Sequence, residues 1–330
     1  MAASPSGSAS DHVRYVGIDE AGYGPNLGPL AMVAVILDGP RVPRFDLWND
    51  VLSGADRAGG EPRSLWIDDS KRVTQDEQGL ARLLAAILFA LRASSGEEVS
   101  SFGRLCERLG AGSLEQVELT ALLSGDHDPV FPPREHAEPA RQWSLAAELI
   151  APEWTLRSPR ARLVGPRQFN AGLDRLGSKA AVHFQAFAEL LTHVWELADD
   201  GAATFVQSDK HGGRHYYLES LHEALPGVWI DRLEERAELS RYVLRGGGRQ
   251  VELRFSPRAD SENGLVAWAS MIAKGLREAW MTEFNRAWGR RIPGLKPTAG
   301  YPVDARRFRG AIESWCQREG LHPDEWWRRK

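Results

Sequence analysis

Apolar residues along the chain recur with two different periods, and each period predicts a different kind of element. Alternating β-branched and aromatic residues predict strands, whereas apolar residues three and four positions apart predict helices. The first two predicted strands, His12 to Ile18 and Leu30 to Leu37, are joined by a Gly/Pro/Asn segment typical of a hairpin. The other predicted strands are Thr155 to Val164, Ala203 to Gln207, Val228 to Leu233, Ser240 to Arg245 and Gln250 to Phe255.

Helical periodicity separates these strands. The predicted helices are Gln75 to Ala93, Gln168 to Leu197, His215 to Ala224, Ser261 to Trp288 and Val303 to Arg318. Because strands and helices alternate from residue 155 onward, the pattern predicts an α/β fold in which helices flank a mixed, partly parallel central sheet.

The pattern also suggests boundaries. Residues 1–12 are mostly Ala, Ser, Pro and Gly and predict a disordered tail. Residues 94–153 combine a loop-rich composition with short helical pieces at Leu114 to Leu123 and Gln142 to Ile150, which favours an inserted subdomain. We therefore expect one main domain over residues 13–310 and a separate basic and aromatic segment over residues 311–330.

Composition narrows the class of protein. The chain has 330 residues, of which 42% are hydrophobic and 26% charged, as expected of a folded chain with a sizeable core. No apolar run approaches the roughly 20 residues of a membrane span, and the first residues do not resemble a secretion signal, so we expect a cytoplasmic protein. Cys106 and Cys316, the only two cysteines, argue against a disulfide scaffold or a zinc site.

Charge is unevenly distributed. The net charge is −4, but residues 271–330 hold thirteen Lys or Arg against seven Asp or Glu, a local +6. Five of the twelve tryptophans also lie in this part of the chain: Trp280, Trp288, Trp315, Trp326 and Trp327. Interleaved basic and aromatic residues can grip a nucleic acid, but aromatic residues at helical spacing more often belong to a core. Both interpretations remain open from this pattern.

Two adjacent acids, Asp19 and Glu20, end the first predicted strand and are followed by Gly22, Gly24 and Gly28. Neighbouring side chains of a strand point to opposite faces, so these acids can share a site only if the strand ends or bulges there. The glycines permit such a geometry. Their spacing is one residue too long for a dinucleotide fingerprint, and a strand rather than a helix follows them.

Two further acids, Asp209 and Asp260, follow later predicted strands. The carboxyl ends of parallel strands meet at one edge of a sheet, where open α/β folds place their sites. Clustered carboxylates repel one another unless a cation intervenes, and oxygen ligands suit Mg²⁺ or Mn²⁺. Taken singly, Asp260 could instead cap the next helix and Asp209 could close a turn.

Four ordered motifs resemble those of the type 2 ribonucleases H, the ribonuclease HII family. The first is the run from Gly17 to Pro29, which reads GIDEAGYGPNLGP. The others are Asp69-Ser70-Lys71, Asp260 with the helix segment from Ala269 to Lys274, and Gly300-Tyr301-Pro302.

The resemblance implies a ribonuclease H-like fold in which Asp19, Glu20, Asp209 and Asp260 bind two divalent ions about 4 Å apart on the scissile phosphate. It further implies cleavage on the 5′ side of a ribonucleotide, leaving a 3′-hydroxyl and a 5′-phosphate. Asp209 and Asp260 lie much farther apart than in the family pattern, so residues 214–250 read as a second insertion. The implied phosphate contacts are Ser70, Lys71 and Lys274.

Two departures concern the substrate. The family carries Gly-Arg-Gly in the loop that approaches the ribose 2′-hydroxyl, whereas this chain has Gly22-Tyr23-Gly24 and lacks the guanidinium. Tyr301 matches the family tyrosine that packs on the neighbouring deoxyribose. The glycine-rich run from Lys210 to Arg214 predicts an anion-binding turn, with His211 and Arg214 as possible substrate contacts or simply part of a basic surface loop.

These observations predict a monomeric, metal-dependent endoribonuclease acting on RNA–DNA hybrids or on ribonucleotides embedded in duplex DNA. Two alternatives remain open. One is a nuclease of the same fold that prefers a branched or other unusual duplex, and the other is a nucleic-acid-binding module without turnover.

Overall fold

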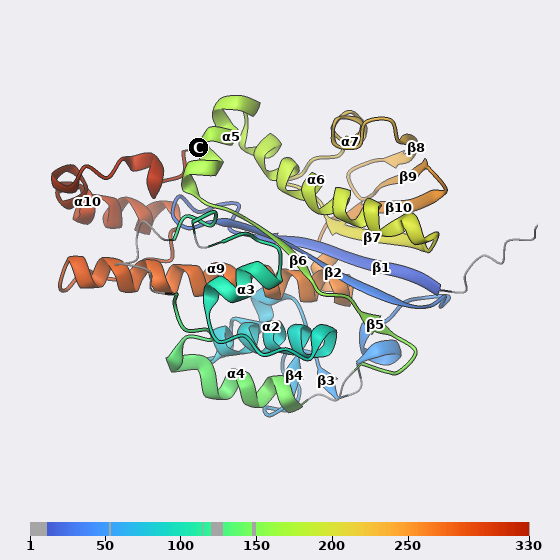
Figure 1. The fold of residues 1–330 in the computed structure, drawn as a ribbon, viewed down its shortest axis with the longest axis horizontal. Helices are drawn as coiled ribbons and strands as arrows, with labels where there is room; N and C mark the ends of the chain where they lie inside the picture. The colour runs from blue at the N-terminus through green and yellow to red at the C-terminus, as the bar shows by residue number, and fades with distance from the viewer. Residues whose placement is uncertain (1–11, 53, 114, 120–127, 147–149, 330) are drawn as a thin grey trace, which may run out of the picture.

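A mixed eight-stranded sheet runs through the protein, which we describe from a computed structural model over residues 12–52, 54–113, 115–119, 128–146 and 150–329 (Figure 1). Strand β1 pairs antiparallel with β2 and parallel with β7, and β7 pairs parallel with β10. The order is β5-β2-β1-β7-β10-β9-β8, with β6 also paired to β2. The strands are β1 (His12–Ala21), β2 (Leu30–Pro40), β5 (Thr155–Leu156), β6 (Arg160–Val164), β7 (Ala203–Asp209), β8 (Trp229–Glu235), β9 (Ser240–Gly246) and β10 (Arg249–Ser256). A separate pair is formed by β3 (Ala55–Asp56) and β4 (Leu65–Trp66).

Helices cover both faces of the sheet, because successive side chains of its strands point to opposite sides. On β2, Val33 and Val35 join the core under α9 and α2, whereas Met32 and Ala34 join the core under α6 (Figure 1). The helices are α1 (Ser70–Val73), α2 (Gly79–Ser95), α3 (Phe102–Arg108), α4 (Arg134–Ala146), α5 (Pro166–Leu176), α6 (Lys179–Leu197), α7 (Leu218–Ala224), α8 (Ala259–Glu262), α9 (Gly264–Arg291) and α10 (Pro302–Glu319), with short turns η1 (Leu47–Val51), η2 (Ala198–Asp200) and η3 (Pro323–Glu325). The predicted α/β class, with a mixed central sheet flanked by helices, is confirmed.

Several element boundaries differ from the prediction. The single helix expected over 168–197 is two helices, because Gly177 ends α5 in the left-handed region at φ 74° and the Ser178 hydroxyl caps α6. Within 94–153, α3 was not predicted, and α4 begins earlier than the helical piece expected from Gln142. Part of that piece, part of the one expected at 114–123, and the predicted tail up to residue 11 lie outside the described residues.

Helix α9 approaches the sheet most closely at Gly17 of β1. A Cβ at this position would lie 2.3 Å from the carbonyl carbon of Leu265 and 2.5 Å from the amide nitrogen of Val266. Only glycine allows the first turn of α9 to rest directly on the strand backbone. This contact sets where Ser270 and Lys274, one and two turns further along the helix, lie relative to the end of β1.

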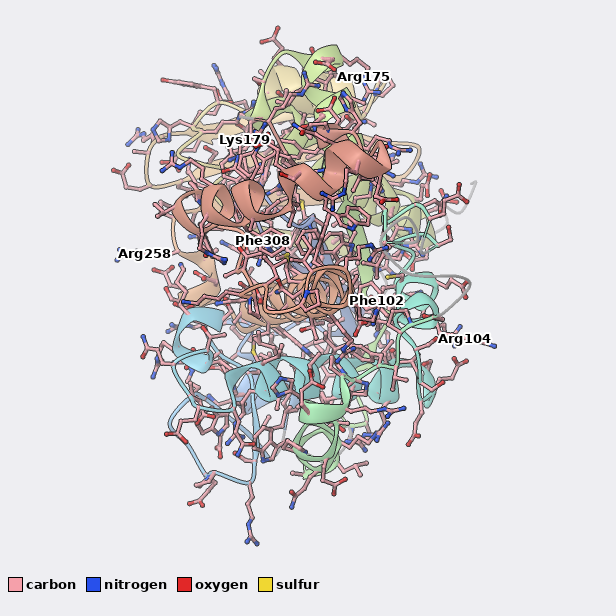
Figure 2. The ribbon with its side chains drawn as sticks, turned by 90° about the vertical axis from the view of Figure 1, so that its left-hand side faces the viewer. Phe102, Arg104, Arg175, Lys179, Arg258 and Phe308 are labelled. Atoms are coloured by element: carbon pink, nitrogen blue, oxygen red, sulfur yellow. The ribbon has the colours of Figure 1, made fainter. Side chains whose placement is uncertain are left out.

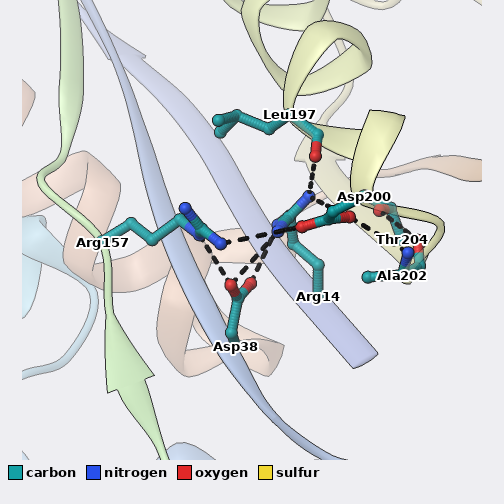
Figure 3. Close-up of polar contacts among 7 residues, drawn as sticks. All are labelled: Arg14, Asp38, Arg157, Leu197, Asp200, Ala202 and Thr204. Carbon is teal, nitrogen blue, oxygen red and sulfur yellow. Dashed lines mark hydrogen bonds and ion pairs between the residues drawn. The ribbon is translucent and has the colours of Figure 1, made fainter. Parts of the chain in front are cut away.

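A buried arginine ties the opposite end of β1 to its neighbours (Figure 3). Arg14 is 0% exposed, and its Nε donates to Asp38 of β2 at 2.8 Å. Its other nitrogens donate to the Leu197 carbonyl oxygen at 2.6 Å and to Asp200 of η2 at 2.6 Å. Arg157 also contacts Asp38, at 2.6 Å. The network fixes the turn between α6 and β7 against the start of the sheet.

The tryptophans of the basic C-terminal part belong to the core rather than to an exposed stacking surface. Trp280, Trp288 and Trp326 are buried, and Trp315 and Trp327 pack against the same core while partly exposed. Figure 2 shows Phe308 on the side of α10 that faces α9. In the described part of the chain, no helix combines the length and apolar character needed to cross a membrane.

Candidate functional site

Asp19 and Glu20 lie on opposite faces of a strand that continues past them. The sequence suggested that β1 ends or bulges at these acids, but its pairing with β2 runs without a break through Ala21. What stops there is the pairing with β7, whose last partners are Ile18 and Ser208. Asp19 faces α9, where the Ser270 hydroxyl donates to it, and Glu20 faces α6, with an oxygen 3.4 Å from His183 Nε2.

Asp209 and Asp260 reach the same edge of the sheet from two other elements. Asp209 is the last residue of β7, one position beyond the Ile18–Ser208 pair, so it stands beside Asp19 on the same face. The Lys210 backbone N–H donates to its carboxylate at 2.7 Å. Asp260 sits in α8, one turn after β10, and is 6% exposed. The structure thus gathers three distant stretches of chain at the carboxyl ends of parallel strands.

The charges of these acids interact. Burial raises the pKa of Asp19 well above its ordinary value, and the charges of Glu20 and Asp260 raise it further. Burial also raises the pKa of Asp209, with contributions from the charges of Asp260 and Glu20. For Asp260 the causes of a raised pKa are burial and the charge of Asp69, opposed by Lys71. Each of the three disfavours its charged form, which is the condition that a bound cation would relieve.

The donor set was tested for its fit to a divalent ion. All four side chains offer only carboxylate oxygens, the ligands that Mg²⁺ and Mn²⁺ prefer. In this structure, however, no three Asp, Glu, His or Cys side chains of the described residues are close enough together to hold an ion. The chemistry of the donors fits the ion, and their side chains would have to turn toward it on binding.

The Asp69-Ser70-Lys71 motif contacts the acids in two ways, through Ser270 of α9 and directly through Lys71. The Ser70 hydroxyl lies 3.2 Å from that of Ser270, which itself donates to Asp19. Lys71 Nζ lies 3.9 Å from Asp260 Oδ2, with a side chain 77% exposed. Motifs 200 positions apart in sequence therefore share one hydrogen-bonded chain.

Lys274 lies one turn beyond Ser270. Its Nζ donates to Thr74 Oγ1 at 3.0 Å, and burial lowers its pKa. Lys71 and Lys274 are the two predicted phosphate contacts that carry charge, and both border the acids on the α1 side.

The glycine loop after β1, which includes Gly22, Tyr23 and Gly24, lies on the side of the acids away from α1. Gly22 has φ 86°, and a Cβ there would lie 2.5 Å from the Pro29 carbonyl oxygen. Tyr23 is half-buried against His183, with Lys179 Nζ 4.3 Å from its ring centroid. Gly24 is exposed and has open space around it.

Tyr301 stands next to this loop. The Gly300 carbonyl oxygen accepts from the backbone N–H groups of Asn26 at 2.9 Å and Leu27 at 3.3 Å. The Tyr301 side chain is 55% exposed. The two predicted substrate tyrosines therefore belong to segments joined by backbone hydrogen bonds.

His211, predicted from the sequence as a possible substrate contact, is buried in this structure. Its ring is fully enclosed by the rings of His183, Phe187 and Tyr217, at centroid distances of 4.6, 4.8 and 5.5 Å. Burial lowers the pKa of His211 well below its ordinary value. The Lys210–Arg214 run turns its histidine inward, against rings that come from α6, from the residue before α7 and, at 5.3 Å, from Phe255 of β10. Arg214 packs on Phe184 at 5.2 Å and donates to Ser220 at 3.1 Å.

Two residues at the candidate site were not predicted. His183 lies beside Glu20, and Arg328 lies under the glycine loop, where it donates to the Gly22 carbonyl oxygen at 2.5 Å. His183 sits within an ordinary amphipathic helix pattern, and Arg328 within a run of basic residues. No local signal in either pattern distinguishes these residues from their neighbours.

Comparisons with known proteins found similarity at low identity to solved structures. No protein-family model matches this chain, and no curated protein does either. Among solved structures, the PCNA:RNase HII complex of Archaeoglobus fulgidus matches at 17% identity and TM-score 0.38, covering 96% of this chain and 95% of that one. Ribonuclease H2 of Pyrococcus horikoshii matches at 15% and 0.38, covering 95% and 92%. Bst-RNase HIII in complex with Mn²⁺ matches at 15% and 0.36, covering 97% and 67%. Similarity at these identities and TM-scores does not assign an activity to this chain.

Proposed function

We propose that this chain is a metal-dependent endonuclease of the ribonuclease H type, which hydrolyses the RNA strand of RNA–DNA hybrids or cuts at ribonucleotides in duplex DNA. One observation carries the proposal: Asp19, Asp209 and Asp260 come from three distant elements, and their charges interact at one edge of the sheet. Their order along the chain follows the motif order of type 2 ribonucleases H.

Asp19, Glu20, Asp209 and Asp260 would hold Mg²⁺ or Mn²⁺. Such ions, when bound, supply an activated water and stabilise the leaving oxygen of a phosphodiester. The chain itself contributes the frame: the Ser270 hydroxyl orients Asp19, and Ser70 in turn contacts Ser270 at 3.2 Å. Lys71 and Lys274 would neutralise backbone phosphates on the α1 side.

Recognition of the substrate would come from the opposite side. Tyr301, more than half exposed, can pack on a sugar, and Gly24 leaves room for a close approach of the strand. Tyr23 cannot make the charge-assisted hydrogen bonds of an arginine. We therefore propose that the protein accepts stretches of RNA in a hybrid more readily than a single ribonucleotide in DNA.

The test uses labelled duplexes that contain no ribonucleotide, one, or four, each with Mg²⁺, Mn²⁺ or a chelator, and with Asp19→Asn as the matched inactive variant. We expect metal-dependent cleavage of the ribonucleotide-containing duplexes, and none by the variant. Cleavage of the all-DNA duplex alone would favour a nuclease for another duplex. Binding without cleavage in either metal would favour a binding module.

A further inference from the structure

Arg328 is a buried charge placed directly beneath the glycine loop. The residue is 1% exposed, and one guanidinium nitrogen donates to the carbonyl oxygens of both Gly22 and Pro25. The plane of the guanidinium also lies over the ring of Phe169 of α5, 4.8 Å from its centroid. One side chain therefore holds both ends of the Gly22–Pro25 turn.

The backbone on either side of Arg328 is fixed as well. The Arg328 N–H donates to the Asn26 carbonyl oxygen at 2.8 Å, and Asn26 Nδ2 donates back to the Arg328 carbonyl oxygen at 3.0 Å. On the other side, Asn170 Nδ2 donates to the Trp327 carbonyl oxygen at 2.8 Å, and Asn170 Oδ1 accepts from the Arg329 N–H at 2.9 Å. Residues 327–329 are thus clamped between α5 and the loop.

Burying the Arg328 guanidinium destabilises the folded state, and no ion pair with a described residue offsets this cost. Among the described residues Arg328 has no carboxylate partner, and its Nε and Nη1 atoms are buried without a hydrogen bond. Burial, assisted by the charge of Arg277, lowers the pKa of Arg328 to about 9. Unpaired buried charges are rare because their desolvation is not repaid. Holding two loop carbonyls is the interaction that accounts for this one.

The direction of those carbonyl groups determines which backbone N–H groups of the loop point away from the core. In a trans peptide, the C=O of one residue and the N–H of the next point in opposite directions. With the Gly22 carbonyl drawn inward to Arg328, the Tyr23 N–H is turned away from the core. Arg277 acts on the far end of the same loop, donating to the carbonyl oxygens of Leu27 at 3.3 Å and Ala299 at 2.8 Å. The loop is held from below at three carbonyls, at Gly22, Pro25 and Leu27, which orients a backbone donor outward.

We infer that Arg328 is a positioning residue for nucleic-acid recognition, holding the Gly22–Pro25 loop from beneath so that its outward backbone donor and Tyr23 meet the substrate strand. The inference rests on the proposed function for the identity of the ligand. The Gly22–Pro25 loop contains no cationic residue of its own, and Arg328, some three hundred positions away in sequence, would order it.

The first test measures loop order without any substrate, by amide hydrogen exchange of the full chain and of Arg328→Met, Arg328→Lys and Arg329→Met. We expect residues 22–27 to exchange about tenfold or more faster in Arg328→Met, with β1 and β7 unchanged, and to be partly restored in Arg328→Lys. Arg329→Met is the matched control, because the Arg329 side chain contacts Asn170 and Asp174 rather than the loop. Unchanged exchange of the loop in folded Arg328→Met, or exchange as fast in Arg328→Lys as in Arg328→Met, overturns the inference.

The second test measures steady-state cleavage of a hybrid duplex. Because the loop would bind the ground state and the transition state alike, KM should rise about tenfold in Arg328→Met while kcat stays within about threefold. Arg328→Lys should recover part of the loss. Equal losses in kcat and kcat/KM would overturn the positioning role. Absence of cleavage by the wild-type chain would reject the proposed function, and hydrogen exchange would still decide whether Arg328 orders the loop.

Discussion

Replacing Asp19 with asparagine should stabilise the metal-free protein at neutral pH. The carboxyl is 6% exposed and faces the charges of Glu20 and Asp260, and the Ser270 hydroxyl and the Glu20 backbone N–H donate to it. Asn keeps the shape and an oxygen acceptor but removes the charge. Every unit by which burial and repulsion raise a carboxyl pKa destabilises the folded state by about 1.4 kcal/mol at higher pH.

The size of the effect follows from this environment. Relief of one buried, repelled carboxylate is of the order of 1–3 kcal/mol. For a chain of this length each kcal/mol moves Tm by about 2 °C, so Asp19→Asn should melt about 2–6 °C higher at pH 8. The sign depends on pH. Because the folded-state pKa is raised, the destabilisation is complete above that pKa and vanishes below the ordinary value near 3.9, so the two proteins should converge as the pH falls toward 4.

The assay is thermal unfolding from pH 4 to pH 8 with a chelator present, with Asp304→Asn as control. Asp304 accepts from the Thr298 hydroxyl at 2.6 Å and from Arg307 at 2.8 Å, and these bonds lower its pKa, so its replacement should reduce Tm at pH 8. Added Mg²⁺ should then stabilise the wild type, by about 2.7 kcal/mol in the free energy of unfolding at a hundredfold excess over Kd, and raise its Tm accordingly. The Tm of Asp19→Asn should rise far less. A variant that is no more stable than the wild type at pH 8, or an advantage that does not change with pH, would refute the reasoning.

Two other variants test the ends of β1 and the phosphate contacts. Arg14→Met should lower the free energy of unfolding by about 2–4 kcal/mol in urea, with an unchanged m-value. This loss is smaller than the roughly 3–5 kcal/mol of a fully buried pair because Asp200 is partly solvated and Arg157 stays with Asp38. A loss no larger than that of Arg157→Met would contradict a central role for Arg14. Lys71→Ala should weaken duplex binding at low salt and reduce the slope of log K against log salt by about 1. Its Tm should stay almost unchanged because the Lys71 side chain is 77% exposed. An unchanged slope would remove Lys71 from the phosphate contacts.

The outline of the fold was predictable because its information is local. Alternation along β2 sends Val33 and Met32 to opposite cores, and the strand predicted over 30–37 lies within the observed β2. Errors arose where one residue decided a boundary. Gly177 and Ser178 end and restart a helix whose apolar pattern is otherwise continuous across α5 and α6.

The acids illustrate what a pattern can and cannot predict about the candidate site. That Asp209 would lie near Asp19 was expected because both follow predicted strands that would run parallel, and the charges of Glu20 and Asp260 act on both. That Glu20 would face α6 instead did not follow, because the sequence does not show that β2 keeps pairing through Ala21 after β7 has stopped. One-sided pairing of this kind depends on tertiary context.

The burial of His211 and the placement of Arg328 have a common physical cause. Both belong to polar runs that a surface loop or a solvated tail would share, and only packing distinguishes them. The residues between Asp209 and Asp260 form two strands beside β10, and Lys210 Nζ donates to Ser240 of β9 at 2.8 Å, which holds the run after β7 against this part of the sheet. In the same way, the clamp of Asn26 and Asn170 draws Arg328 under the glycine loop. Each of these segments packs against part of the candidate site without contributing one of its four acids, and differences in substrate choice should be sought in these supports.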